Sequence, residues 1–306
     1  MTFADVESAR KAYWSKLKKG LPIVIIPAAI EIPLLIATFF SFGSFASSGG
    51  SATMFTAITA GVASIAGAII LFFIIAKPRA AYHKAYKAYF VEQTLRKTFT
   101  DLTYDHQKGL SAYLLSATGM INIGDDYSSN DLTIAKYKNT GFTQSDVHIQ
   151  TVSTDSDGNT TYTTIFKGRV MIFEFPKKFD FKLELIGKKF RAYRVPGKDQ
   201  STGRKMVKID TESTEFNQTF KIFGQDGFET FYILDPAMIV RIQAIAEHYK
   251  DKVLLGFYDN KMLVALDDGK DSFEPPRPSK PIDEKAETDK VASDIKVITD
   301  FVDVIS

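Results

Sequence analysis

The sequence predicts an α+β protein in which a two-helix transmembrane hairpin precedes a mostly antiparallel α+β cytoplasmic domain. Two apolar runs, residues 21–42 and 52–76, contain Glu31 as their single charge. Residues 104–273 instead show short alternating apolar runs separated by Gly, Asn and Asp, which is typical of strands joined by turns. We therefore expect three parts: a membrane hairpin with flanking amphipathic helices over 1–99, the α+β domain over 100–274, and a Pro- and charge-rich linker with a C-terminal amphipathic helix over 275–306.

Composition excludes some classes of protein and site. The chain has 38 basic and 36 acidic residues, so its formal net charge of +2 gives no global electrostatic reason to expect a nucleic acid as partner. It has no cysteine, which excludes disulfides, thiol catalysis and any cysteine-ligated metal.

Each apolar run is long enough, as a helix rising about 1.5 Å per residue, to cross a hydrocarbon core of about 30 Å. The connection "SFGSFASSGGS" can turn and carries no basic residue, whereas basic residues flank both outer ends: Arg10, Lys11, Lys16, Lys18, Lys19, Lys77, Arg79, Lys84 and Lys87. This pattern predicts a multi-pass protein of the cell membrane, with two spans in the lipid bilayer and both termini cytoplasmic. The alternative is a signal peptide cleaved near Ser44 and Ala46, which would still leave the large domain cytoplasmic.

Glu31 lies near the middle of the first run, where an acid is costly. One hypothesis is a protonated carboxyl that packs against the second helix. The other makes Glu31 an intramembrane polar site, used for proton or cation transport or for docking a membrane-protein partner. Small residues at four-residue spacing in the second run, such as Ala57 and Gly61, suit close packing with the first run or with another copy in a homo-oligomer.

Residues 79–99 are predicted to form a helix with tyrosines at spacings of three and four, which suit either the headgroup region or packing on the following domain. Later segments predict strands: "SDVHIQTV", "TTYTTIFKGRVMIFEF", "FDFKLELIG", "TFKIFG" and "ETFYIL". "DSDGN" predicts a hairpin with positive φ at Asp157 and Gly158, and a second hairpin is predicted to turn at Asp259 and Asn260.

One helix is predicted between these hairpins. Asp235 can cap its N-terminus and Pro236 suits its first position. The residues expected on its buried stripe are Met238, Ile242, Ile245 and Tyr249.

Five segments occur in order across residues 104–266: "GDDYSSNDLTIAKYKN", "FTQSDVHIQ", "FKGRVMIFEFPKKF", "STEFNQTFKIFGQDGFETFYILDPAM" and "GFYDNKMLVAL". Together with the paired spans, they resemble a bacterial membrane protein family known as domain of unknown function 3137. The resemblance implies a membrane-anchored cytoplasmic domain without an established activity. It supplies no functional residues to carry over.

The search for catalytic, metal and cofactor motifs finds none. The histidines, His83, His106, His148 and His248, show no metal-ligand spacing, and His148 is expected to be an ordinary surface residue on the same strand face as Asp146. Two segments, 126–137 and 155–166, begin like calcium loops but lack the glycine at the sixth position and the glutamate at the twelfth, so their first residues are expected to form turns.

The segment "GKDQSTGRKM" mimics a phosphate loop but lacks its lysine, and a hairpin loop is expected there. A cluster of basic residues between 177 and 208 is a candidate lipid-facing patch for anionic headgroups, with nucleic acid as the weaker partner and an ordinary solvated strand face as the simpler explanation. Its named members are Lys177, Lys178, Lys182, Lys188, Lys189, Arg191 and Arg194.

The C-terminal apolar stripe is spaced alternately by four and three residues: Val291, Ile295, Ile298, Val302 and Ile305. It is too short for a stable coiled coil, so the tail is expected to dock on a partner helix, on its own domain or on the membrane surface. Taken together, the sequence favours a non-enzymatic, membrane-anchored adaptor that binds a protein partner or anionic lipid headgroups. An oligomeric transporter or channel that uses Glu31 is the alternative.

Overall fold

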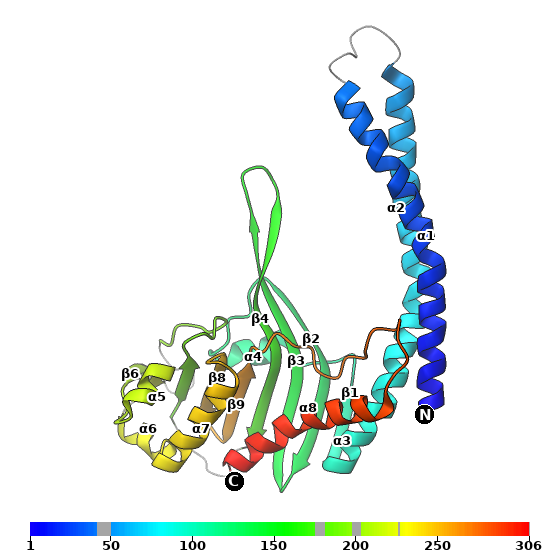
Figure 1. The fold of residues 1–306 in the computed structure, drawn as a ribbon. Helices are drawn as coiled ribbons and strands as arrows, with labels where there is room; N and C mark the ends of the chain where they lie inside the picture. Colours follow the sequence, from blue (N-terminus) through cyan, green and yellow to red (C-terminus); the bar gives the residue numbers. More distant parts are fainter. Residues whose placement is uncertain (42–49, 175–180, 198–202, 226, 306) are drawn as a thin grey trace. The chain divides into compact units, whose positions relative to one another are not determined.

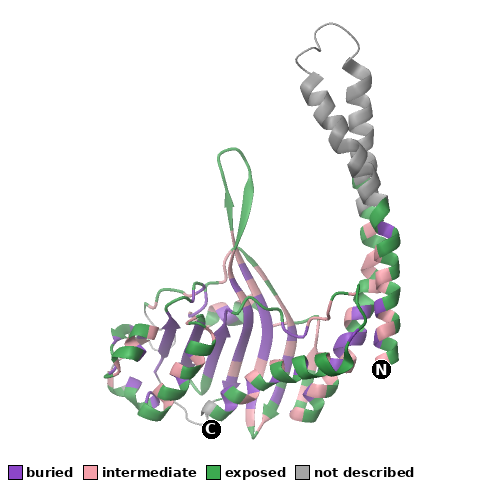
Figure 2. Ribbon diagram, viewed as in Figure 1, coloured by how far each residue is buried: buried purple, intermediate pink, exposed green. Residues whose placement is uncertain are grey.

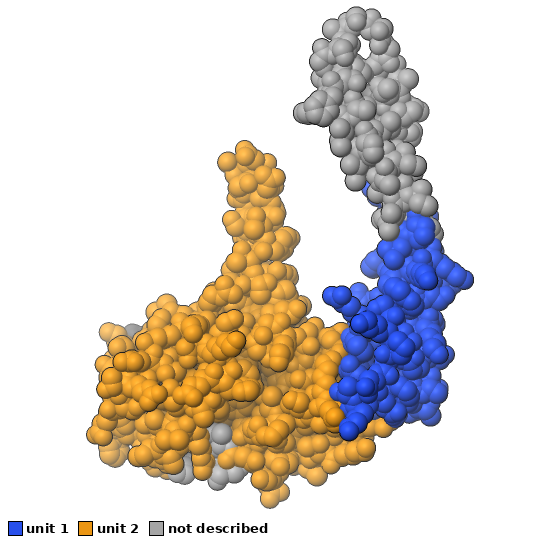
Figure 3. All heavy atoms as spheres, viewed as in Figure 1, with its two compact units in different colours: residues 1–90, 275–287 blue, residues 91–274, 288–306 orange. Residues whose placement is uncertain are grey.

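The computed structural model describes residues 1–41, 50–174, 181–197, 203–225 and 227–305, and within these ranges the side chains of residues 23–41, 50–64, 67–68, 229 and 304–305 lie outside the description. The chain forms two compact units (Figure 3). Unit 1 comprises residues 1–90 and 275–287, and unit 2 comprises residues 91–274 and 288–306.

Unit 1 is built on two helices that lie side by side, α1 (Phe3–Ser41) and α2 (Gly50–Tyr86) (Figure 1). Gly20 marks a close approach, because a side chain at this position would collide with Leu71. A π-helical turn, η2 (Lys87–Val91), continues α2. The aromatic ring of Phe3 reaches this end of the helix and packs on Phe90, with ring centroids 6.2 Å apart.

Residues 275–287 belong to unit 1 because they bond to both of its helices. The Tyr82 hydroxyl donates to the carbonyl of Pro276 at 2.9 Å, and the backbone N–H of Ile282 donates to Glu7 at 2.9 Å. Further along, the Tyr86 hydroxyl donates to Glu287 at 2.7 Å. The tyrosines predicted on one face of residues 79–99 therefore bind this segment.

The predicted localisation is contradicted. In the part of the chain whose side chains are described, the structure contains no helix that is both long and apolar enough to cross a membrane. A cell-membrane protein with two spans and cytoplasmic termini is therefore not supported. The predicted spans, 21–42 and 52–76, fall largely on residues whose side chains lie outside the description. Where side chains of α2 are described, several apolar ones are exposed: Ile65, Ile69, Ile70, Phe72 and Phe73.

Unit 2 confirms the α+β class with a large antiparallel sheet, whose strand order is β1-β2-β3-β4-β9-β8-β5-β7-β6. The strands are β1 (Thr100–Asp105), β2 (Asp126–Tyr137), β3 (Thr140–Thr154), β4 (Thr160–Glu174), β5 (Leu183–Gly187), β6 (Val207–Ile209), β7 (Phe220–Gly224), β8 (Val253–Tyr258) and β9 (Lys261–Leu266). The helices are α3 (Glu92–Thr98), α4 (Ala112–Ala117), α5 (Thr214–Thr219), α6 (Gly227–Ile233), α7 (Pro236–His248) and α8 (Glu284–Ile305).

Strand register assigns the residues of β2, β3 and β4 to two faces. Phe142 pairs with Phe173 across β3 and β4, and Phe173 stacks on Phe301 of α8, so these residues lie on the face that α8 covers (Figure 1). Because side chains alternate along a strand, Thr143 and its partner Ile172 lie on the opposite face. Buried residues fill most of β5, β8 and β9 and the parts of β3 and β4 that lie away from their connecting turn (Figure 2).

The second face carries an apolar core. Residues from α4 and the segments that follow it, including Leu115 and Ile121, pack with Val147 of β3 and Val170 of β4. Beyond this core, the β3–β4 hairpin extends past the sheet with exposed side chains (Figure 1). One face of the sheet is therefore covered by α8, and the other is covered by the α4 region over only part of its area.

Several predicted elements are confirmed. Asp235 caps α7 by accepting the N–H of Met238 at 2.8 Å, and Ile242 of the predicted stripe is buried. The β3–β4 turn forms as expected, although Gly158, with φ of 83°, and not Asp157 supplies its positive φ. The tail docks on its own domain, and its described stripe is buried: Val291, Ile295, Ile298 and Val302.

Two predictions of local structure are wrong. "ETFYIL" lies in and just after α6 because β7 already pairs with β5 on one side and β6 on the other, so no ladder position is open beside it. A helix satisfies the backbone hydrogen bonds of this segment internally. The turn expected at residues 126–130 is instead the start of β2, which pairs with residues 146–150 of β3.

Candidate functional site

Three predicted site residues cannot be placed. The side chain of Glu31 in α1 lies outside the description, and so do Lys177 and Lys178, which precede β5. The candidate intramembrane site and the first part of the candidate basic patch therefore fall outside the described residues.

Lys182 does not belong to an exposed basic patch, because it is buried. Its ammonium group lies 2.9 Å from the carboxylate of Glu184 and donates to the carbonyl of Thr118 at 2.7 Å. The alternation expected for a half-exposed strand fails here, since every residue of β5 is buried. Lys182 thus joins the sheet to the end of α4 and is not part of an exposed basic surface.

The other described members of the patch are exposed: Lys188, Lys189, Arg191 and Arg194. Three of them bond to groups of unit 2, since Lys189 pairs with Asp251 at 3.3 Å, Arg191 donates to the carbonyl of Thr164 at 3.2 Å, and Arg194 donates to Ser116 at 3.1 Å. These contacts fit the simpler explanation, a solvated surface with local bonds.

A groove lies on the face of the sheet that the α4 region leaves partly open. Its volume is about 1160 Å³. The floor comes from β2, β3 and β4, where Ile134, Thr143 and Ile172 share one face. Ile134 is 44% exposed although it occupies the middle of a strand, so the floor presents apolar surface to solvent.

The walls of the groove add further apolar side chains. Tyr113 and Leu114 of α4 line one part of it, and Val195 lines another. Tyr113 is 85% exposed and Val195 is 81% exposed. Charged residues of both signs complete the lining: Asp101, Lys136, Glu174, Glu184, Lys182, Arg194, Asp259 and Lys261. The pair Lys136–Asp101, at 2.9 Å, shows that both signs occur side by side at its edge.

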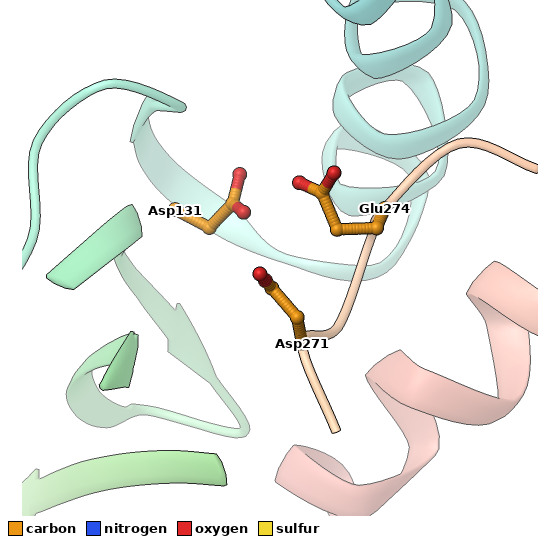
Figure 4. Close-up of side chains that lie close together, drawn as sticks. All are labelled: Asp131, Asp271 and Glu274. Atoms are coloured by element: carbon orange, nitrogen blue, oxygen red, sulfur yellow. The ribbon is translucent and has the colours of Figure 1, made fainter. Parts of the chain in front are cut away.

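A cluster of carboxylates lies elsewhere in unit 2. Asp131 of β2 faces Asp271 and Glu274, which belong to the segment after β9, and the three carboxyl groups surround a common space (Figure 4). One oxygen from each lies within 4.8 Å of the others. Asp131 is fully buried, whereas Asp271 is exposed.

Neighbouring donors hold this cluster in place. The Tyr104 hydroxyl donates to Asp131 at 2.5 Å, and the Asn130 amide donates to the other oxygen of Asp131 at 2.8 Å and to Asp271 at 3.5 Å. Burial, and then the negative charge of Asp131, raise the pKa of the Tyr104 phenol. Tyr104 therefore remains a donor, and its hydrogen bond favours the ionised form of Asp131.

Asp146 of β3 adjoins the cluster and is buried, with its side chain 4% exposed. Burial raises its pKa to about 7; Arg169 opposes this increase, and the charges of Asp131 and Asp271 add to it. Neither carboxylate oxygen has a hydrogen-bond partner in the described structure. The backbone N–H of Ser272 also favours the ionised form of the carboxyl and so opposes the rise in its pKa.

His148 is not paired with Asp146. Its Nε2 lies 3.0 Å from the hydroxyl of Thr164, whereas the nearest described cation to Asp146 is Arg169, at 3.9 Å. The expectation of an ordinary histidine held by a neighbouring polar group fits this geometry.

Sequence reasoning missed both the groove and the carboxylate cluster. Asp131 and Asp271 are far apart in the chain, so no local spacing connects them. Residues 126–137 lack the glycine and the glutamate of a calcium loop, yet one of them, Asp131, lies in the carboxylate cluster. Its positive φ of 57° and the register shift of β2 beside it place its side chain there.

Comparison with known proteins gives one similar solved structure and one family match, whereas no curated protein matches this sequence. Among solved structures, the crystal structure of the mycobacterial trehalose monomycolate transport factor A, TtfA, is similar at 8% sequence identity and a TM-score of 0.37, and the match covers 73% of this chain and 96% of that one. A similarity this distant supports no conclusion about function.

The second match is to a family. The model described as protein of unknown function (DUF3137) matches residues 164–306, from within β4 to the C-terminus. The resemblance predicted from the sequence is confirmed in this range, which starts later than the quoted segments and includes the tail. The bacterial membrane origin that the resemblance implied is not part of the match. The C-terminal part of the chain, residues 164–306, thus matches the DUF3137 family of proteins of unknown function.

Proposed function

We propose that this chain is a non-enzymatic adaptor whose unit 2 binds a segment of another protein in the groove beside α4. The observation that carries the proposal is the floor of that groove, where Ile134 is 44% exposed within β2, a strand that is paired on both sides. Apolar surface of this kind, enclosed by walls and edged with polar groups, is typical of a binding site.

A polypeptide suits the groove better than a lipid headgroup. Exposed Tyr113 provides a large amphipathic contact of the type enriched at protein interfaces. The lining carries both charge signs, as the Lys136–Asp101 pair shows, whereas an anionic headgroup requires an excess of basic groups. The basic patch predicted for lipids is weakened by the burial of Lys182.

Site-specific photo-crosslinking tests this function. A photoreactive amino acid replaces Tyr113 or Val195, one on each wall of the groove, in cells that produce the full chain. The control position is Phe228 of α6, which is 87% exposed and does not line the groove. We expect the same protein to crosslink from both walls and not from the control position.

A variant makes the test specific. Ile134→Glu places a charge on the apolar floor at a position that is partly exposed, so the fold is expected to persist, as circular dichroism would show. Crosslinking from residue 113 should then be lost. Adducts that persist in this variant, or that form equally from residue 228, would refute the proposed groove.

A further inference from the structure

We propose that Asp131, Asp271 and Glu274 bind one calcium ion, which fastens the segment after β9 to strand β2. This site is separate from the groove, and the proposal does not depend on the function assigned there. The three residues come from two elements, so a shared ion would connect positions that are distant in the sequence (Figure 4).

The geometry and the type of ligand favour calcium. All three side chains offer carboxylate oxygens, which are the hard ligands that Ca²⁺ and Mg²⁺ prefer. The three oxygens lie within 4.8 Å of one another, a span that one Ca²⁺ ion with bonds of about 2.3–2.6 Å can bridge. Ca²⁺ accepts irregular sets of oxygen ligands, whereas Mg²⁺ demands near-ideal octahedral geometry and usually keeps several waters, so three protein carboxylates on two elements suit Ca²⁺ better.

Asp146 is a second and independent sign of a missing positive charge. It is buried beside the cluster, neither of its oxygens has a hydrogen-bond partner in the described structure, and its nearest described cation, Arg169, lies 3.9 Å away. Asp146 pairs across the β2–β3 ladder with Asn130, the residue that precedes Asp131 and donates to it. A buried carboxylate is costly unless it is paired or close to a metal ion.

Negative charge is concentrated at this place. Four acidic residues gather here, Asp131, Asp146, Asp271 and Glu274. Arg169 lies 3.9 Å from Asp146 and also donates to the carbonyl of Asp294, and Lys290 donates to the carbonyl of Glu274 at 2.8 Å. A divalent cation would be attracted to this concentration of carboxyl groups.

The cluster has both support and access. Tyr104 and Asn130 donate to Asp131 and hold its two oxygens in place, as outer groups do around metal ligands. Asp271 is exposed, so an ion can reach the site from solvent. The structure therefore provides ligands, an oriented outer layer and an entry path.

Terbium luminescence tests the site directly, because Tb³⁺ replaces Ca²⁺ and is excited by a nearby tyrosine. Full-length protein is first treated with EDTA and then titrated with TbCl₃, and CaCl₂ is added as competitor. We expect emission that saturates at one equivalent and is displaced by Ca²⁺. Tyr104→Phe should reduce the emission at saturation while CaCl₂ still raises the melting temperature.

Ligand variants identify the residues. Asp271→Asn changes an exposed side chain and should leave the fold intact, yet weaken Ca²⁺ binding by at least about 10- to 100-fold, because the loss of even a supporting group of a metal site costs that much. Glu274→Gln should do the same. Asp157→Asn, which changes an exposed carboxylate in the β3–β4 turn, serves as the matched control and should bind Ca²⁺ like the wild type.

Three results would overturn the proposal. The first is the absence of Ca²⁺-dependent change in melting temperature and of Tb³⁺ emission at millimolar concentration. The second is binding that Asp271→Asn and Glu274→Gln leave unchanged. The third is stabilisation by MgCl₂ and not by CaCl₂, which would exclude the assigned ion.

Discussion

Asp146→Asn tests whether a buried carboxyl controls the pH dependence of stability. Asp146 lies on the sheet face under α8, and burial raises its pKa from the ordinary 3.8 to about 7 despite the opposing charge of Arg169. Asparagine keeps the shape of the side chain and removes its titration. Arg169 retains its bond to the carbonyl of Asp294 in the variant.

The sign of the effect follows from proton binding. Between pH 3.8 and about 7, the folded protein keeps the proton of Asp146 while the unfolded chain has lost it. Stability therefore falls as pH rises through this window and levels off above it. The whole shift corresponds to about 4 kcal/mol, since each pKa unit is worth about 1.4 kcal/mol. Between pH 5 and pH 8 the expected loss is about 3 kcal/mol.

Urea denaturation at pH 5 and pH 8, followed by circular dichroism in EDTA, measures this loss. We expect the unfolding free energy of the wild type to fall by about 3 kcal/mol between pH 5 and pH 8. Asp146→Asn should not show this fall, because its residue 146 does not titrate. Asp157→Asn, at an exposed position, should follow the wild-type profile. Parallel pH profiles for Asp146→Asn and wild type would mean that the buried carboxyl does not titrate in this window, which would refute the argument from burial.

Three further substitutions test the packing of unit 2 by urea denaturation. Lys182→Ala should cost about 3–5 kcal/mol because it leaves Glu184 buried without this partner, whereas replacing both residues with Met and Leu should be nearly neutral. Phe301→Ala should cost about 3–5 kcal/mol by removing a buried ring that stacks on β4, and the control Thr299→Ala should change little. Gly168→Ala should cost about 1–3 kcal/mol because its Cβ would collide with the backbone carbonyl of Leu266; a neutral effect would contradict the close approach of β4 and β9.

Local signals in the sequence predicted local structure well. The cap at Asp235 and the turn at Gly158 depend on a few adjacent residues, and both formed. The C-terminal stripe predicted a docked helix but left its partner open, because periodicity shows which face is apolar and not what covers it. The structure resolves this, since Phe301 of α8 stacks on Phe173 of the same unit.

Errors arose where tertiary pairing decided the outcome. The aromatic segment "ETFYIL" has strand propensity, but strand neighbours already occupy both edges of β7. Lys182 was expected in an exposed basic patch, whereas it is buried next to β5, a strand that is buried on both faces. The carboxylate cluster joins Asp131 to residues that follow β9, and only the folded sheet brings them together.

The sheet face under α8 is not uniform, and this bears on how the tail docks. At one part of the helix Phe301 stacks on Phe173, an apolar contact that needs no ion. Earlier in the helix, Lys290 donates to the carbonyl of Glu274. The carbonyl of Asp294 accepts a hydrogen bond from Arg169, which lies beside buried Asp146. The stability of the Phe301–Phe173 contact comes from apolar burial and does not depend on bound ions. The polar contacts near Lys290 and Asp294 involve buried charges, which are costly unless they are paired. If the proposed Ca²⁺ ion binds beside Asp146, its removal should therefore loosen the tail first near Lys290 and leave the packing at Phe301 in place.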